Sequence, residues 1–234
     1  MPPDYMIADL ERMARATNYS AWLQRLVMPE LGQRVIEVGC GIGNFTGMLL
    51  SREAVAAVDI DPACVARLAQ RYPGQANLRA FVCEPGSPAF ADLARWQPDS
   101  CVCLNVLEHI PDDTRALQAM ASVLVPGGVI VLLVPAFQAL YGPIDRNLSH
   151  CRRYSRKSLV KLAQVTGLRI ETLHYVNAIG FFGWWINAKI LRREEQSAAQ
   201  IAIFDRYIVP WLSRAEAIAP PPFGQSLFAV LRKP

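Results

Sequence analysis

The sequence has few charged residues and few histidines. Only 19% of its 234 residues are Asp, Glu, Lys or Arg, and the formal net charge is +4. So small a positive excess does not indicate a nucleic-acid-binding protein, and we expect no nucleic-acid partner. The three histidines and six cysteines lack the spacing of a structural metal site, and no C-x-x-C pair occurs. We expect the cysteines to be reduced and mostly buried.

Segments that would direct the chain to a membrane are also missing. The start, MPPDYMIADLERM, has no cationic segment followed by an apolar run, which favours a cytoplasmic location. The apolar run from Leu173 to Leu191 is interrupted by Asn177, Asn187 and Lys189, so it is too polar for a confident transmembrane helix. With 52% hydrophobic residues and no internal repeat, the chain is expected to form one domain, residues 1–234.

The most informative stretch runs from Arg34 to Pro62. A β-branched run at 35–38 predicts a buried parallel strand, and the glycine cluster 39–43 follows it directly. Glycines can take positive φ angles and let a ligand approach the backbone. We expect a helix from about residue 44 to 50 and a second strand at 55–58 that ends in Asp59. An acid about 20 residues after the first glycine is placed to bind a ribose.

The glycine spacing distinguishes two classes of cofactor. The dinucleotide fingerprint G-x-G-x-x-G/A needs a small residue where Asn44 stands. The chain instead carries E-x-G-x-G-x-G at Glu37, Gly39, Gly41 and Gly43, which resembles motif I of the class I S-adenosylmethionine-dependent methyltransferases. The resemblance implies methyl transfer from S-adenosylmethionine to an oxygen, nitrogen or carbon of a small, largely apolar molecule. Two alternatives stay open: an S-adenosylmethionine-binding protein that transfers no methyl group and, less favoured, an NAD-dependent oxidoreductase.

The same resemblance implies an α/β fold with a Rossmann-like seven-stranded sheet, order 3-2-1-4-5-7-6, last strand antiparallel. A helical cap at 1–33 would precede a core made of 34–176 and 224–234, and a helical insert at 177–223 would separate strands six and seven. Apolar runs predict the fourth strand at 101–106 and the fifth at 129–134, and apolar periodicity predicts helices through 90–96 and 155–166.

The resemblance also assigns residues to the cofactor. Asp59 would bind the ribose, and Gly41 would allow the close approach of the backbone. Tyr19, in a fragment that looks like the family's N-Y-x-x-W, would reach the methionine carboxylate or the substrate, or only pack the helix on the sheet. Glu84 would lie near the adenine amino group or be a solvated loop charge. The full expected set is Tyr19, Glu37, Gly39, Gly41, Asp59, Ile60, Glu84 and Asn105.

Two histidines are candidates for catalysis. His109 follows the fourth strand in the fragment N-V-L-E-H-I, and His150 lies in the loop after the fifth strand. An imidazole titrates near neutrality and could take a proton from the acceptor, although His109 could equally only cap a turn or orient the loop. Quinone-biosynthesis relatives that resemble this segment bind a metal with a further acid at the position of Asn105. We therefore expect no metal here.

The loop after the fifth strand and the insert are expected to bind the acceptor. Tyr141, Arg153 and Tyr154 are the predicted substrate residues in the loop, where the arginines could bind an acidic group or fix the loop by ion pairs. Trp184 belongs to an aromatic group in the insert with Phe181, Phe182 and Trp185. Such a group covers the substrate, a second subunit or, least favoured, a membrane surface. The chain is thus expected to be a monomer or a homodimer.

Overall fold

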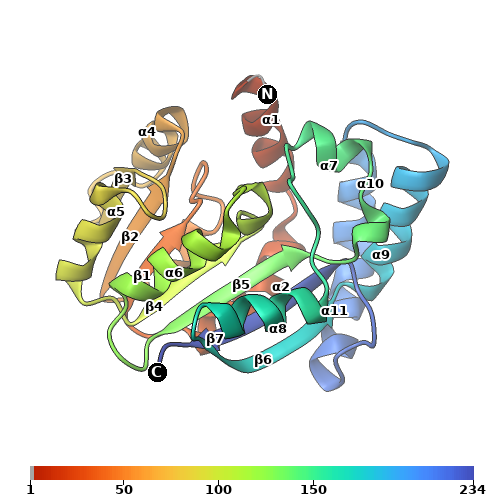
Figure 1. Ribbon diagram of the computed structural model, residues 1–234. Coiled ribbons are helices and arrows are strands. Elements are labelled where there is room, and N and C mark those ends of the chain that lie inside the picture. The colour runs from red at the N-terminus through yellow and green to blue at the C-terminus, as the bar shows by residue number, and fades with distance from the viewer. Residues whose placement is uncertain (1–2) are drawn as a thin grey trace.

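Seven strands form one mixed sheet in the computed structural model, which describes residues 3–234 (Figure 1). The strand order is β3-β2-β1-β4-β5-β7-β6, with β1 to β5 parallel and β7 antiparallel to both β5 and β6. This arrangement confirms the predicted fold class and strand order. The strands are β1 Arg34–Val38, β2 Ala54–Asp59, β3 Leu78–Val82, β4 Ser100–Leu104, β5 Val129–Pro135, β6 Arg169–Val176 and β7 Ser226–Arg232.

Helices cover both faces of the sheet and also lie beyond the carboxyl ends of β4 and β5 (Figure 1). Two irregular segments, 186–190 and 204–208, continue α9 and join α10 to α11. The helices are α1 Pro3–Met13, α2 Thr17–Val27, α3 Thr46–Leu49, α4 Pro62–Arg71, α5 Pro88–Ala91, α6 Asp113–Val123, α7 Pro143–Asn147, α8 Arg156–Val165, α9 Ala178–Trp185, α10 Ala198–Ile203 and α11 Val209–Ile218.

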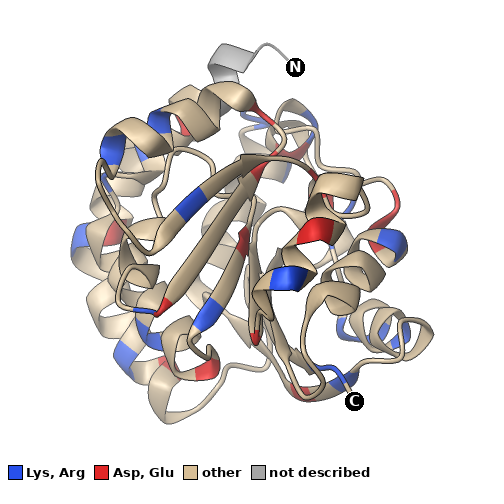
Figure 2. Cartoon of the chain, turned by 90° about the vertical axis from the view of Figure 1, so that its left-hand side faces the viewer, with Lys and Arg blue, Asp and Glu red and all other residues tan. Residues whose placement is uncertain are grey.

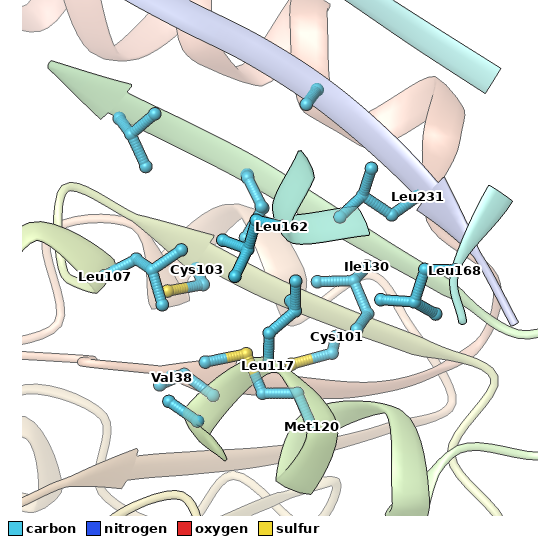
Figure 3. Packing of buried hydrophobic residues seen from close by; sticks show 14 of the residues in the cluster. Val38, Cys101, Cys103, Leu107, Leu117, Met120, Ile130, Leu162, Leu168 and Leu231 are labelled. Carbon is cyan, nitrogen blue, oxygen red and sulfur yellow. The ribbon is translucent and has the colours of Figure 1, made fainter. Parts of the chain in front are cut away.

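The central strands are buried on both faces because they are apolar at successive positions. In β1, Ile36 belongs to the cluster that contains Leu117 of α6 and Leu162 of α8, which Figure 3 shows from close by. The neighbouring Val35 belongs to the opposite cluster, with Trp22 of α2. Five of the six cysteines are buried, and all six are free thiols. The residues that follow the strand ends are therefore attached to a sheet that is packed on both faces.

Three local expectations differ from the structure. The helix after the glycine cluster comprises only Thr46–Leu49, because Gly43 takes φ 84° and the side chain of Asn44 donates to the carbonyl of Leu10. Strand β4 ends at Leu104, because Asn105 adopts a left-handed φ of 53°. The predicted helix at 90–96 is split into α5 and a tighter 3₁₀ turn at 92–96.

A buried acid of the insert, Asp205, ties the N-terminal helices to it, and the partly buried Glu216 ties α9 to α11 within the insert. Asp205 accepts hydrogen bonds from the backbone N–H groups of Asn18 and Tyr19, so it caps the N-terminus of α2 from a distant part of the chain. Glu216 likewise accepts from the N–H groups of Asn177 and Ala178 at the start of α9, at 2.9 Å each. The predicted cap and insert are thus adjacent. Figure 2 shows acidic and basic residues interspersed on the side that it presents.

Candidate active site

The glycine turn lies at the carboxyl ends of β1 and β2. Gly39 and Gly41 take φ angles of 75° and 50°, and Gly41 donates its N–H to Oδ2 of Asp59 at 2.8 Å. Asp61 donates its N–H to the other carboxylate oxygen at 3.0 Å. A side chain at Gly39 would meet Val106, which follows β4, so a glycine is required there by packing as well as by φ. The turn and Asp59 thus form one preorganised unit.

The ends of β2 and β3 place the residues predicted for the nucleoside side by side. Asp59 pairs with Val82, and the N–H of Cys83 donates to the Asp59 carbonyl at 3.0 Å. Ile60 exposes 68% of its surface beside this pair, and Glu84 is also exposed. A carboxylate next to an exposed apolar side chain suits a ribose joined to a flat base. The structure brings these predicted residues together, and their contacts with the cofactor remain predictions.

Glu37 lies deeper than its predicted role suggests. It is 4% exposed, and its Oε2 accepts a hydrogen bond from the Thr46 hydroxyl at 2.6 Å. Burial raises the pKa of Glu37 to about 8, while the Thr46 hydrogen bond opposes the shift. At neutral pH the folded protein therefore favours the protonated acid, and a contact between Glu37 and the cofactor stays a prediction.

We expect Glu37→Gln to stabilise the protein increasingly as the pH rises. The unfolded glutamate ionises near pH 4.5, whereas the folded one ionises near pH 8, so each increase in pH across this window disfavours folding of the parent. The amide keeps an acceptor for Thr46 and has no charge to bury, so the free energy of unfolding should exceed that of the parent by about 3–4 kcal/mol more at pH 8 than at pH 5. Urea unfolding at pH 5 and pH 8, with the exposed Glu53→Gln as control, measures this difference. A pH-independent effect of Glu37→Gln would contradict the buried, protonated state.

Two other predicted cofactor residues are held mainly by the protein itself. The Tyr19 ring packs edge-on against Trp22 with 5.9 Å between ring centroids, and burial raises the pKa of its hydroxyl to about 12. This contact favours the packing alternative, and a contact with the cofactor stays a prediction. Asn105 is exposed in its left-handed conformation, and its N–H donates to the carbonyl of Leu133.

Helix α1 packs against the glycine turn, and one of its acids interacts electrostatically with the histidine site. A Cβ at Gly41 would come within 3.0 Å of the Leu10 side chain. The preceding residue, Asp9, is buried, and its charge interacts with His150. Burial raises the pKa of Asp9, and one of its carboxylate oxygens lacks a hydrogen-bond partner. Consecutive residues of one helix therefore contact the predicted cofactor turn and approach a predicted catalytic residue.

His150 forms a dyad with a buried aspartate. Its Nδ1 lies 3.0 Å from Oδ1 of Asp145, a side chain with no exposed surface. Its Nε2 lies 4.0 Å from Oε1 of Glu108, and the Glu108 oxygens have no hydrogen-bond partner. Burial raises the pKa of Glu108 to about 8. Sequence reasoning missed both Asp145 and Glu108 as site residues, although Glu108 adjoins His109 and Asp145 lies in the same polar loop as His150.

His109 has a different environment. Its ring stands nearly perpendicular to that of His150, with 4.6 Å between centroids. It also hydrogen-bonds to the backbone at Leu148 and Asn105, which links the loop after β5 to the end of β4. Burial, together with the neighbouring His150, lowers the pKa of His109 to about 4. These contacts favour the loop-orienting alternative for His109 and leave His150 as the better candidate base.

The expectation of no metal rested on the spacing of the histidines and cysteines and on Asn105. Within residues 3–234, Glu108, His109 and His150 bring one ligand atom each within 4.8 Å of one another. This separation is compatible with a shared ion, and His150 comes from a loop that the sequence did not connect with the N-V-L-E-H-I fragment. The absence of a metal therefore stays a prediction.

The residues predicted to contact the substrate from the loop have internal partners. Arg153 pairs with Asp145 and donates to the carbonyl of Ala136 at 3.1 Å. The buried Tyr154 hydroxyl lies 3.0 Å from Oδ2 of Asp113, and the Tyr141 hydroxyl donates to the His150 carbonyl at 2.8 Å. These contacts favour the alternative in which ion pairs fix the loop. A direct role in substrate binding stays a prediction for all three residues.

The insert contributes an apolar wall. The Trp184 ring lies 4.5 Å from the guanidinium of Arg153, and its indole N–H is buried without a hydrogen-bond partner. Nearby rings line an apolar hollow of about 360 Å³, formed by Phe137, Ala139, Leu140, Phe181, Phe182 and Trp185. Phe182 and Trp185 remain 53% and 45% exposed. Within residues 3–234, each helix is too short or too polar to cross a bilayer.

Comparison with known proteins identifies the family. A sequence profile of a methyltransferase domain matches residues 10–173. A ubiquinone biosynthesis O-methyltransferase of Xanthomonas euvesicatoria is 39% identical over 108 residues, which cover 43% of this chain and 42% of that protein. The chain thus matches less than half the length of this curated relative.

Solved structures agree on the fold. An S-adenosylmethionine-dependent methyltransferase from Mesorhizobium loti gives a TM-score of 0.59 at 16% identity and covers 90% of this chain and 96% of that chain. The N-methyltransferase NodS from Bradyrhizobium japonicum, crystallised with S-adenosylhomocysteine, gives 0.55 at 16% identity and covers 92% and 84%. At these identities the likeness concerns the fold.

The chain belongs to the methyltransferase domain family. Its fold and family place it among the class I S-adenosylmethionine-dependent methyltransferases, with S-adenosylmethionine as the cofactor. The class and the cofactor predicted from the sequence are thereby confirmed. The roles of individual residues and the identity of the acceptor remain predictions.

Proposed function

We propose that the protein transfers a methyl group from S-adenosylmethionine to an oxygen atom of a small molecule, and that His150 removes the acceptor's proton. The observation that supports this most directly is the His150–Asp145 pair, whose Nδ1 and Oδ1 are 3.0 Å apart, in a loop that hydrogen-bonds to the segment after β4, the strand beside β1 and its glycine turn. The predicted donor site and a base with a free ring nitrogen would thus border one cleft. Both lie beyond the carboxyl ends of parallel strands, where ligands of such sheets bind.

The proposed reaction needs positioning and one proton transfer. When bound, S-adenosylmethionine would supply a methyl group activated by its sulfonium, and the transfer would break the methyl C–S bond and form a C–O bond. Nε2 of His150 takes the hydroxyl proton, and neutral S-adenosylhomocysteine leaves. Asp59 and the glycine turn would hold the donor, while α1 and the loop after β5 would exclude water. Alignment of donor and acceptor supplies much of the acceleration.

The acceptor is proposed to carry an apolar part. The hollow formed by the loop after β5 and by α9 is lined by aromatic and aliphatic side chains. Apolar surface of this kind favours a hydrophobic substituent over a charged one. The name of the Xanthomonas relative, a ubiquinone biosynthesis O-methyltransferase, supports oxygen as the acceptor atom over nitrogen or carbon.

The test combines binding with turnover. Calorimetry should show binding of S-adenosylmethionine and none of NAD. Labelled methyl groups should then appear on alkyl-substituted phenols, with release of S-adenosylhomocysteine, and not on amines of the same size and apolarity. Transfer to the amines alone would exclude the proposed oxygen acceptor. Tight S-adenosylmethionine binding without transfer to phenol, amine or carbon acceptors would support the non-transferring alternative.

A further inference from the structure

Near the histidines, Asp145 is a buried acid whose two carboxylate oxygens both have hydrogen-bond partners. It lies in α7, and its side chain has no exposed surface. Oδ2 accepts the N–H of Gly142 at 2.9 Å, and Oδ1 lies 2.7 Å from Nε of Arg153 and 3.0 Å from Nδ1 of His150. Burial by itself raises the pKa of Asp145, but the His150 hydrogen bond and the Arg153 charge hold it below its usual range. Asp145 is therefore an ionised carboxylate.

An ionised carboxylate can only accept hydrogen bonds, which determines where His150 carries its proton. In the neutral imidazole, the nitrogen that faces Asp145 must be the N–H donor. Nδ1 therefore carries the hydrogen and Nε2 keeps the lone pair. The nearest carboxylate oxygen to Nε2, Oε1 of Glu108, is 4.0 Å away, which is too long for a hydrogen bond. The basic nitrogen is left free.

A second layer of side chains holds Asp145. The Arg153 side chain is 1% exposed and divides its donors between Asp145 and the carbonyl of Ala136, directly after β5. Its guanidinium lies over the Trp184 ring at 4.5 Å, a distance typical of a cation–π contact. Arg153 therefore connects Asp145 with the end of β5 and with α9. Rotation of Asp145 away from His150 would break its hydrogen bonds with Arg153 and with the N–H of Gly142.

We propose that Asp145 is a positioning residue that holds His150 in the Nδ1–H tautomer with Nε2 free, and that Arg153 fixes Asp145 in this orientation. The tautomer follows from the contacts alone. Its catalytic consequence rests on the proposed function, in which Nε2 of His150 takes the acceptor's proton. In that case Arg153 acts on the acceptor only through Asp145 and His150.

The first experiment reads the tautomer without any turnover. Nitrogen-15 NMR of protein labelled in its three histidines, at a pH where the imidazoles are neutral, should show His150 protonated at Nδ1 and unprotonated at Nε2. The His150→Gln spectrum assigns the signal. In Asp145→Asn the amide N–H can donate to Nδ1, so Nε2–H should gain population. An Nε2–H tautomer in the parent would overturn the proposal, and this measurement requires no variant to be active.

The second experiment separates positioning from stability. Asp145→Asn should lower kcat about a hundredfold or more with S-adenosylmethionine affinity unchanged, because the base presents the wrong nitrogen. Arg153→Lys keeps the charge but not the paired donors, and should lower kcat less than Arg153→Gln. The control is Asp99→Asn: Asp99 accepts backbone N–H groups of residues 33 and 34 at the opposite end of the sheet, so this change should lower only stability.

The two proposals can fail separately. If the parent shows the Nδ1–H tautomer and Asp145→Asn changes it, while phenols are not methylated, positioning stands and the proposed function falls. If phenols are methylated and Asp145→Asn retains the parental kcat, the positioning role is wrong and the function stands. A folded Arg153→Gln variant with unchanged kcat and unchanged His150 signals would likewise contradict the role of Arg153.

Discussion

Changing Asp59 to Asn is expected to weaken S-adenosylmethionine binding by about 10- to 100-fold. Asp59 holds the glycine turn through the N–H of Gly41 and also accepts the N–H of Asp61, and its remaining lone pairs are available for a ribose diol. Charge-assisted hydrogen bonds of this kind contribute about 1.5–3 kcal/mol each. The asparagine keeps the size of the side chain and one acceptor, so the loss should appear as weaker binding in calorimetry while the protein remains folded.

The neighbouring Asp61 supplies the control for this change. Its side chain caps α4 by accepting the N–H of Ala63 at 2.8 Å. Asp61→Asn keeps a capping side chain and should leave the dissociation constant within a few-fold of the parent. If Asp59→Asn bound S-adenosylmethionine as tightly as the parent, the nucleoside would have to bind elsewhere, and the assignment of Ile60 and Glu84 would fall with it.

Changing His150 to Gln is expected to lower kcat by roughly 100- to 10,000-fold, the usual range for loss of a general base. S-adenosylmethionine affinity should change little, because the ring contacts Asp145 and approaches Glu108 rather than the glycine turn. Single-turnover measurements with a phenol acceptor would separate the chemical step from product release. The effect should shrink at high pH, where the acceptor ionises without assistance.

Variants of the other two histidines test whether the loss of kcat is specific to His150. His174 lies in β6, is partly buried and packs on Phe228, so His174→Gln should retain the parental kcat. His109→Gln should lower stability more than kcat, because the ring links the backbone at Leu148 and Asn105. If His109→Gln alone abolished turnover while His150→Gln did not, the roles assigned here would be reversed.

Local sequence patterns were sufficient to predict the cofactor-binding segment of this protein. The strand, glycine cluster, strand and acid between Arg34 and Asp59 are consecutive in the chain, so their spacing predicts a nucleoside site, and the family resemblance extends this to the order of the sheet. Expectations were wrong where a single backbone conformation intervened. Asn105 shortened β4 by turning left-handed, and Gly43 with Asn44 reduced the following helix to one turn.

The histidine site depended on contacts that no local pattern contains. Glu108 and His150 are 42 positions apart, and they meet because the loop after β5 folds back on the end of β4, with Arg152 paired to Asp113 at 2.7 Å. Asp145 contacts His150 because α7 places its side chain in the interior, and Arg153 is buried and donates a hydrogen bond to Asp145 instead of lying on the surface. By itself, the sequence determined the nucleoside-binding unit, because that unit depends on short-range spacing, and the family resemblance that its motifs carry supplied the strand order and the cofactor. Only the tertiary structure decided which polar residues of the loop face one another, because burial and hydrogen-bond partners depend on packing between distant segments.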